Sequence, residues 1–364
     1  MTSFDYSARM DRARREMTDR GVDVLLASLG SDLPYLTGYQ AMPLERLTMA
    51  VVPREGEPVL VVPELEAPRV DPVPGVFSIK PWTETEDVIA IVAALVGASR
   101  IAMIGDHTWA VFLLALQAAL PDTEFRSARP LTEALRLVKE PAEIELLRQA
   151  GASADVVAGL LAVHTFEGKT ESQLSREVAA LLEANGTDVA GFAIVASGPN
   201  GASPHHEPGD RVIGAGDAVV IDFGGTVAGY SSDTTRMFHV GEPSAKYLEV
   251  HEVVRAAQEA GVAAARPGVT AESVDRATRA VIEDAGYGEF FIHRTGHGIG
   301  LDGHEDPYIV AGNSQILQPG MAFSIEPGIY LPGDFGVRIE DVVVCTSDSV
   351  ERMNQSPRQV AIVK

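Results

Sequence analysis

The sequence predicts an α/β N-terminal domain followed by a strand-rich α+β domain that contains an internal repeat. The chain has 364 residues, which is too long for one ordinary domain and favours two. Helical and strand patterns alternate over residues 1–130, whereas residues 131–364 begin with helical patterns and continue with strands. Within this second part, two segments share the same spacing of glycine, alanine, isoleucine and an acid.

The first domain, residues 1–130, is predicted from short apolar runs that alternate with helical periodicity. The sequence TETED near the start of one helical pattern indicates a capping box with negative charge at the helix start. The chain has no G-x-G-x-x-G after a strand and no Walker lysine, so we expect no nucleotide site. Helices are expected at 7–20, 83–96 and 109–120, and strands at 23–28, 47–53, 57–63 and 100–106, with a hairpin around REGE.

The second domain, residues 131–364, opens with helical patterns. Pro141 interrupts the first of them, because proline cannot continue a helix. A glycine ends the second, and Thr270 is the expected N-cap of the last. Helices are expected at 131–164, 172–186, 245–265 and 270–286, and the remainder reads as strands.

The internal repeat begins at Gly216 and again at Gly320. In GDAVVIDFGG and in GMAFSIEPGI, alanine follows the glycine by two positions, isoleucine by five and a carboxylate by six. A glycine-containing reversal and a second acid then follow, eleven residues on in the first segment and fourteen in the second. We expect two hairpins that bring their acids face to face in a pseudo-twofold domain. The acids are Asp222 and Asp233 in the first segment, and Glu326 and Glu340 in the second.

These four acids predict a metal site. Three of them end apolar strands, and buried carboxylates must be protonated, paired or bound to cations. Two divalent ions would supply +4 against −4, and His297 would add a nitrogen ligand. Oxygen-rich donors with one imidazole and no sulfur suit Mn²⁺, Co²⁺ or Fe²⁺ and tolerate Zn²⁺. The alternative is a set of edge-strand acids that face water.

Histidines in glycine-rich segments supply candidate catalytic groups. The stretch HRTGHGIGLDGHEDP, residues 293–307, holds three of them, and glycine lets a backbone approach a ligand closely. Two metal ions would favour hydrolysis, in which Glu326 is the candidate proton shuttle. The oxyanion of the tetrahedral intermediate needs a hydrogen-bond donor, and His205 and His304 are candidates. The alternative for these two is a histidine in a surface loop.

Composition argues against several classes of function. The formal net charge of −22, from 29 Lys+Arg and 51 Asp+Glu, disfavours binding to nucleic acids or anionic membranes. No run approaches the ~20 apolar residues of a membrane span, and MTSFDYSARMDRARREM lacks the apolar region of a secretory signal. The single cysteine, Cys345, forbids a disulfide within the chain. G-x-S-x-G and H-E-x-x-H motifs are absent. We therefore expect a cytoplasmic protein.

At these motifs the second domain resembles the pita-bread metallopeptidases, a family that includes prolidase, aminopeptidase P and methionine aminopeptidase. The resemblance lies in VIDFGGTVAGYSSDTTR, HRTGHGIG, HEDPYIV, QPGMAFSIEPGIY and GVRIEDVVVC, across roughly residues 190–345. It implies two divalent metal ions, for which the donor types make manganese the expected metal. It also implies three histidines that support the ligands or contact the transition state: His205, His293 and His304. The metal ligands that it implies are Asp222, Asp233, His297, Glu326 and Glu340.

The first domain favours the prolidase type within this family. Methionine aminopeptidases usually lack such a domain, whereas SLGSDLPYLTGYQ resembles a stretch that recurs in prolidases and aminopeptidase P. The resemblance implies a homodimer that hydrolyses Xaa-Pro bonds in short peptides, with dipeptides as the first expectation. Three alternatives stay open: an Xaa-Pro aminopeptidase on longer peptides, a creatinase-like C–N hydrolase, and a binding protein without catalysis.

Recognition of proline needs its own residues. A peptide bond to proline is a tertiary amide without an N–H, so proteases that bind this N–H are obstructed. A dipeptidase must hold the ring and also read the free carboxylate. Arg294 or Arg338 could read it, although Arg338 could instead support the buried acids. Sequence candidates for substrate contact are Arg338, His206, Arg294 and Tyr230.

Overall fold

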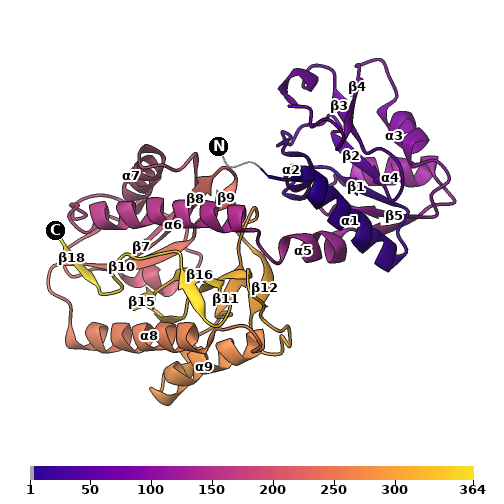
Figure 1. Cartoon of the computed structure of the whole chain (residues 1–364). Helices are drawn as coiled ribbons and strands as arrows, with labels where there is room; N and C mark the ends of the chain where they lie inside the picture. The colour runs from indigo at the N-terminus through magenta and orange to yellow at the C-terminus, as the bar shows by residue number, and fades with distance from the viewer. Residues whose placement is uncertain (1–3) are drawn as a thin grey trace. The chain divides into compact units, whose positions relative to one another are not determined.

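The computed structural model describes residues 4–364, which divide into two compact units at Arg136 and Leu137 (Figure 1). The first three residues, part of the stretch predicted to lack a secretory signal, lie outside the described residues. From residue 4 to residue 364, no helix is both long enough and apolar enough to cross a membrane. Each unit has a hydrophobic core of its own.

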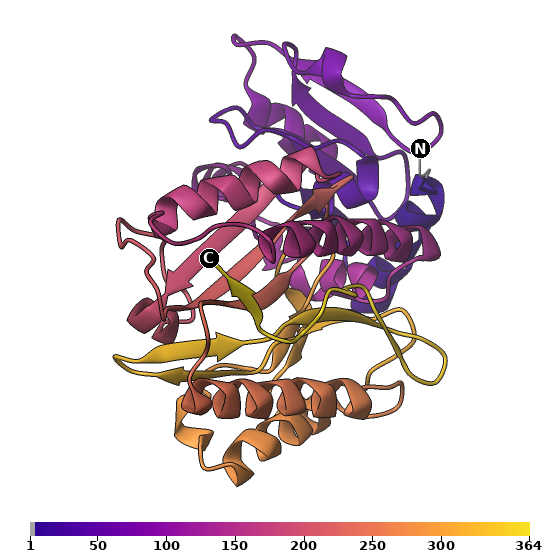
Figure 2. The same ribbon diagram turned by 90° about the vertical axis from the view of Figure 1, so that its left-hand side faces the viewer.

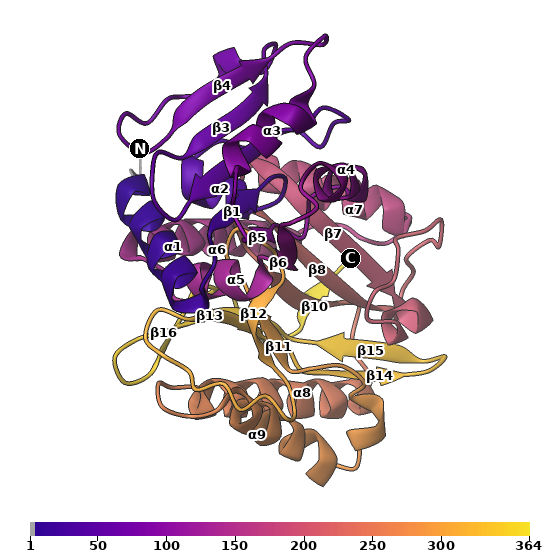
Figure 3. The same ribbon diagram turned by 90° about the vertical axis from the view of Figure 1, so that its right-hand side faces the viewer.

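The first unit is a six-stranded sheet with helices, which agrees with the predicted α/β class, although two of its strands, at 78–82 and 124–127, were not among the expected ones. The strand order is β4-β3-β2-β1-β5-β6 (Figure 3). β1 pairs in parallel with β5, while β2 and β3 form the predicted antiparallel hairpin. The strands are β1 Val24–Ala27, β2 Met49–Pro53, β3 Val59–Pro63, β4 Ser78–Trp82, β5 Ile101–Ile104 and β6 Glu124–Ser127. The helices are α1 Tyr6–Arg20, α2 Asp32–Thr37, α3 Val88–Val96, α4 Ala110–Ala119, α5 Arg129–Arg136 and the 3-10 helix η1 Ala67–Arg69.

The core of this unit lies between the sheet and two of its helices. Val24 and Leu26 of β1 point to the same face, because side chains alternate along a strand. They pack with Val92 of α3 and Leu116 of α4 in one buried cluster. The apolar runs that predict β1 and β2 fit this packing, because all or nearly all residues of both strands are buried.

One helix start differs from its prediction, and one predicted cap lacks its side-chain hydrogen bond. α3 begins at Val88 and not near Thr83, because the Asp87 carboxylate accepts hydrogen bonds from the backbone of the first helical turn. Thr83 and Glu86 instead close a separate turn, in which the Thr83 N–H donates to Glu86 at 2.7 Å. Thr270 stands at the N-cap of α9, as predicted, but its side chain makes no capping hydrogen bond.

The second unit places two sheets between two pairs of helices. One sheet has the strand order β18-β10-β8-β7, with β9 paired to β8, and the other β12-β11-β13-β16-β17. Its helices are α6 Pro141–Leu161, α7 Glu171–Ala184, α8 Ala245–Ala264 and α9 Ala271–Asp284, with the 3-10 helices η2 Gly198–Ala202 and η3 Gly288–Phe290. Its strands are β7 Val189–Ser197, β8 Ala218–Val227, β9 Tyr230–Ser231, β10 Thr234–Val240, β11 Gly296–Gly298, β12 Glu305–Ile309, β13 Ala322–Ile325, β14 Gly328–Leu331, β15 Phe335–Arg338, β16 Asp341–Cys345, β17 Val350–Arg352 and β18 Ala361–Val363.

Helices α6 and α7 cover one side of these strands, and α8 and α9 cover the other (Figures 1 and 2). The first pair shares a core with β7 and β8, in which Val157, Leu174 and Ile221 are fully buried. On the other side, Val250 of α8 packs with Val337 of β15 in a second core. As predicted, the first helical pattern is broken before Pro141, which is the first residue of α6.

The predicted repeat is present as two antiparallel strand pairs. β8 pairs with β10, so that Asp222 lies opposite Thr235. β13 pairs with β16, so that Ile325 lies opposite Asp341. The two acids of the second repeat are farther apart in the sequence because the hairpin β14–β15 lies between them. The two pairs bring the acid-bearing ends of the repeats to one place, which confirms the pseudo-twofold α+β architecture.

Close backbone packing explains the glycines of β11. A Cβ added at Gly296 would stand 1.9 Å from the Ser324 carbonyl oxygen, and one at Gly298 would stand 2.2 Å from that of Asp306. By contrast, a Cβ at Gly303 would meet nothing within 4 Å. The glycines of this strand are thus needed for sheet packing, and this packing fixes His297 between them.

We therefore predict that Gly296→Ala destabilises the fold. Overpacking at a backbone that cannot retreat should cost about 2 kcal/mol or more of the free energy of unfolding. Chemical denaturation would measure this loss, with Gly303→Ala as the matched control in the same segment. Equal stability of the two variants would contradict the packing argument.

Candidate metal centre

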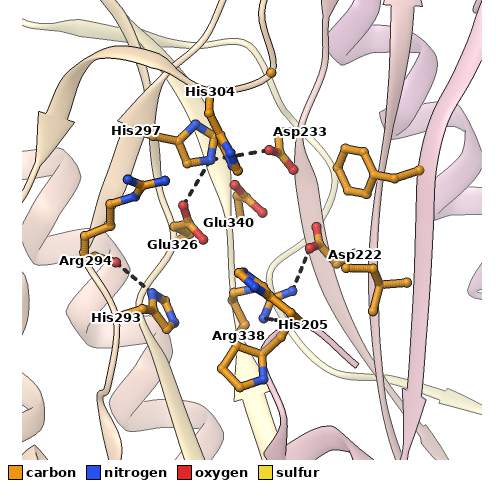
Figure 4. Close-up of a pocket in the computed structure, with 14 residues that line it drawn as sticks. His205, Asp222, Asp233, His293, Arg294, His297, His304, Glu326, Arg338 and Glu340 are labelled. Atoms are coloured by element: carbon orange, nitrogen blue, oxygen red, sulfur yellow. Dashed lines mark hydrogen bonds and ion pairs between the residues drawn. The ribbon is translucent and has the colours of Figure 1, made fainter. Parts of the chain in front are cut away.

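The four repeated acids and His297 line one cavity of about 530 Å³ in the second unit (Figure 4). β8 carries Asp222 and β11 carries His297. The other three lie beside strand ends: Asp233 follows β9, Glu326 follows β13 and Glu340 precedes β16. All except Glu326 are at most 9% exposed to solvent. Strand pairing thus brings together residues that are far apart in the sequence, up to 118 positions in the case of Asp222 and Glu340.

The donor atoms form three overlapping groups. Asp222, Asp233 and Glu340 make one group, His297, Glu326 and Glu340 a second, and Asp233, His297 and His304 a third. Within each group, one candidate ligand atom per residue lies within 4.8 Å of the others. Because the groups share members, the cavity contains adjacent positions where oxygen and nitrogen donors converge.

Without cations, this arrangement is electrostatically unfavourable. Burial, reinforced by the nearby Asp222 charge, raises the pKa of Asp233 well above its usual value. Burial and the neighbouring Asp233 do the same to the pKa of Glu340. Burial would also raise the pKa of Glu326, but the hydrogen bond and charge of His297 outweigh it and lower that pKa to about 2. Without a metal ion, the site therefore favours the protonated forms of Asp233 and Glu340 more than water would.

Two further observations fit a divalent cation. The buried Glu340 Oε1 has no hydrogen-bond partner, although Oε2 of the same carboxyl accepts from Thr235 at 2.8 Å. His297 Nδ1 lies 3.1 Å from the Gly298 carbonyl oxygen, which can only accept, so Nδ1 carries a proton. The other nitrogen, Nε2, lies 3.2 Å from Glu326 and 3.6 Å from Asp233. Burial alone would lower the pKa of His297, but the hydrogen bond to Glu326 and the nearby acids raise it, so a metal ion would have to displace the Nε2 proton to reach the lone pair. Once Nε2 has lost that proton, the imidazole is arranged as a metal ligand.

His293 sits in a directed chain of hydrogen bonds beside this cluster. Arg338 donates to the Tyr330 hydroxyl at 3.0 Å, and that hydroxyl lies 2.8 Å from His293 Nε2. His293 Nδ1 in turn donates to the Arg294 carbonyl at 2.7 Å. Burial lowers the pKa of His293, so the ring is neutral and the chain keeps its direction. Burial also raises the pKa of Tyr330 to about 12, which keeps its proton available.

The other two predicted histidines face the cavity from loops. The ring centroid of His304 lies 3.9 Å from that of His297. Partial burial and the neighbouring His297 lower the pKa of His304 to about 4, so its ring is neutral at neutral pH. His205 is exposed and lines the same cavity, on the side of Arg338 (Figure 4). The structure thus brings together His205, His293 and His304 around the acids.

The substrate-contact candidates separate into two classes. Arg294 and Arg338 line the cavity, whereas His206 and Tyr230 are not among its lining residues. His206 turns to Glu171 at 2.8 Å, and the Tyr230 hydroxyl donates to Glu143 at 2.7 Å. The geometry therefore does not support the predicted role of His206 and Tyr230 as pocket walls, because the polar group of each is hydrogen-bonded to a buried carboxylate outside the cavity lining.

Arg338 has the supporting role that the sequence left open. Its guanidinium donates to Asp222 at 2.6 Å and to the Thr235 hydroxyl at 2.9 Å, and it is almost fully buried. Thr235 also donates to Asp222 at 3.0 Å and to Glu340. Sequence reasoning missed Thr235 and Tyr330. The signal for Thr235 was its position two residues after Asp233, which returns it to the Asp222 side of the hairpin.

Apolar side chains complete the cavity wall. Phe192 and Ile194 project from β7 into the cavity, and Pro204 and Gly303 lie at its edge. Sequence reasoning did not identify Phe192 or Ile194, because alternating residues of an edge strand look the same whether they face solvent or a ligand. The cavity combines this apolar wall with charged groups, as small-molecule sites usually do.

Family models match both units of the chain. Residues 145–347 match metallopeptidase family M24, and residues 9–138 match the creatinase/prolidase N-terminal domain. These matches cover the cavity and the sheet of the first unit, respectively. They agree with the resemblance that the sequence motifs indicate.

Relatives with similar sequences and folds are peptidases by name. A probable dipeptidase of Mycobacterium tuberculosis is 42% identical over 98% of this chain and 96% of its own length. An Xaa-Pro dipeptidase of Lactobacillus helveticus is 36% identical over 97% of this chain and 98% of its own. A crystal structure of prolidase from Thermococcus sibiricus superposes with a TM-score of 0.94 at 37% identity, over 98% of this chain and 99% of that one. The pita-bread fold predicted for the second domain is confirmed.

We predict that metal binding releases protons. Cations must compete with the protons that the raised pKa values of Asp233 and Glu340 favour, so affinity for the metal should rise as the pH rises. Calorimetric titration of metal-free protein with Mn²⁺, in two buffers that differ in ionisation enthalpy, would count the protons.

The Glu340→Gln variant is the control, because it lacks one of the protonated carboxyl groups. It should bind Mn²⁺ more weakly and release fewer protons per bound ion. Binding by the unaltered protein without proton release, and with an affinity independent of pH, would contradict the electrostatic description of the site.

Proposed function

Because the chain belongs to metallopeptidase family M24 and is a peptidase, we propose that it hydrolyses Xaa-Pro dipeptides with two divalent metal ions. The complete set of five donors around one cavity carries the proposal. A binding protein that had lost catalysis would not need to keep four acids in a place where burial opposes their ionisation. The names of the relatives support the dipeptide specificity.

The proposed metal ligands are the four repeated acids and His297. Asp233, Glu340 and His297 each belong to two of the three donor groups, and they would hold bound ions together with Asp222 and Glu326. Oxygen donors with one imidazole favour Mn²⁺, with Co²⁺, Fe²⁺ or Zn²⁺ as alternatives. When bound, such ions supply Lewis acidity to a substrate carbonyl. The ligand set is Asp222, Asp233, His297, Glu326 and Glu340.

Side chains around the ligands supply proton transfer and hydrogen bonding. Glu326 is ionised at neutral pH and can accept the proton of the attacking water. His304 is neutral there and can donate a hydrogen bond to the developing oxyanion, and His205 is the second candidate donor. Tyr330 and Arg338 hold His293 in a single orientation and tautomer.

The substrate would be small and carry a carboxylate. Phe192 and Ile194 offer an apolar wall for the proline ring. Arg294 lines the cavity, and its guanidinium lies over the Tyr308 ring at 4.4 Å. Arg338 is committed to Asp222 and Tyr330, so we assign the free carboxylate to Arg294. A homodimeric state and a cytoplasmic location stay predictions.

The proposal predicts metal-dependent release of proline from Ala-Pro. Protein stripped with EDTA should be inactive and should regain activity with Mn²⁺, Co²⁺ or Zn²⁺. The tripeptide Ala-Pro-Ala should be cleaved more slowly, because its proline lacks the free carboxylate, and Met-Ala should not be cleaved. Amino-acid analysis of the products would measure all three rates.

Preference for Ala-Pro-Ala would identify an aminopeptidase instead. If none of the three peptides is cleaved by protein that holds two metal ions, the peptidase proposal fails. Non-peptide amides such as creatine would then be the next substrates to test.

A further inference from the structure

We propose that Glu171 is a positioning residue that fixes the loop carrying His205 at the cavity. Glu171 is the first residue of α7, and its side chain is 0% exposed. It lies outside the cavity lining and outside the proposed ligand set. The inference rests on the proposed function, because His205 acts there as a hydrogen-bond donor.

The Glu171 carboxylate binds the loop along most of its length. Oε1 accepts from the Ser197 N–H at 2.8 Å, from the Ser197 hydroxyl at 2.7 Å and from Asn200 Nδ2 at 3.0 Å. Oε2 accepts from Asn200 Nδ2 at 3.1 Å, from His206 at 2.8 Å and from the Gly209 N–H at 3.3 Å. These donors span residues 197–209, and His205 lies inside that span.

The loop is also held from the cavity side. Arg338 donates to the Pro204 carbonyl oxygen at 3.2 Å, one residue before His205. His206, one residue after it, is bound to Glu171. His205 is therefore placed between two anchored neighbours, one tied to α7 and the other to the residue that supports Asp222.

His205 depends on these anchors because it has none of its own. In the described part of the chain, its imidazole makes no hydrogen bond, and the residue is exposed. Its position therefore follows from the backbone of residues 204–206. A donor that must meet an oxyanion at hydrogen-bond distance loses effect when its backbone moves by even a fraction of that distance.

The carboxylate form of Glu171 is needed for this role. Burial alone would raise its pKa, but the hydrogen bonds from Ser197, His206 and Asn200 lower it, so the group stays ionised and accepts from every donor. In Glu171→Gln, one oxygen becomes an NH₂ group that faces donors. At least part of the loop then loses its acceptor, which costs more than a missing bond because the donors remain buried.

The test is a double-mutant cycle with Glu171→Gln and His205→Ala, assayed on Ala-Pro with Mn²⁺. Glu171→Gln should lower kcat about tenfold, as loss of a supporting partner typically does, with KM and bound Mn²⁺ unchanged. In the His205→Ala background the same substitution should have little further effect on kcat. Glu183→Gln, which removes an exposed charge from the same helix, is the matched control and should leave kcat unchanged.

Hydrogen exchange gives a readout that does not need activity. Amides of residues 198–209 should exchange faster in metal-free Glu171→Gln than in the unaltered protein or in Glu183→Gln, while β8 and β13 stay protected. An equal fall in kcat in both backgrounds, or unchanged exchange in 198–209, would overturn the inference.

Two further comparisons apply if a variant does not fold or if the protein is inactive on Ala-Pro. If Glu171→Gln does not fold, His206→Ala removes a single donor from the same carboxylate and should show the same coupling to His205. His206→Gln, which can still donate to Glu171, should restore kcat. If the unaltered protein does not cleave Ala-Pro, the proposed function fails, while the exchange comparison still decides whether Glu171 holds the loop.

Discussion

The mutual repulsion of buried carboxylates is the constraint on which the site depends. Asp222, Asp233, Glu326 and Glu340 converge in a cavity where, among the described residues, Arg338 is the only arginine that donates to one of their carboxyl groups. Burial raises the pKa of Asp233 and Glu340, so the fold alone does not stabilise their ionised forms. Bound divalent cations would relieve this repulsion, and the same cations would provide the Lewis acid for peptide hydrolysis.

The rest of the second unit holds these acids together against that repulsion. Behind Glu340, the buried Asp341 accepts from Arg236 at 2.8 Å and from Gln258 at 2.9 Å, and Arg236 also donates to the Glu340 carbonyl. The strand that carries Glu340 is therefore fixed through its neighbour. On the facing hairpin, Thr235 links Asp222 with Glu340. The backbone is set before a metal arrives, as preorganised sites require.

The sequence predicted the parts of this site that periodicity and repetition encode. Apolar strands ending in acids, repeated at Gly216 and Gly320, predicted which carboxylates would meet. The glycines beside His297 suggested close approach to a ligand, whereas Gly296 and Gly298 in fact pack against neighbouring backbone. Contacts across the fold carry no such pattern. His206 stands next to His205 in the chain, but its bond to Glu171 turns it elsewhere, and the Tyr230 hydroxyl is taken by Glu143. Tyr330 and Phe192 acquire their roles only from the positions of other strands.

The most direct test of the account is an anomalous-difference map from crystals grown with Mn²⁺. Two peaks are expected about 3.5–4 Å apart, among Asp222, Asp233, His297, Glu326 and Glu340. Absence of any peak between these side chains at saturating Mn²⁺, with the acids still turned inward, would contradict it. The buried charge would then have to be balanced by protons alone.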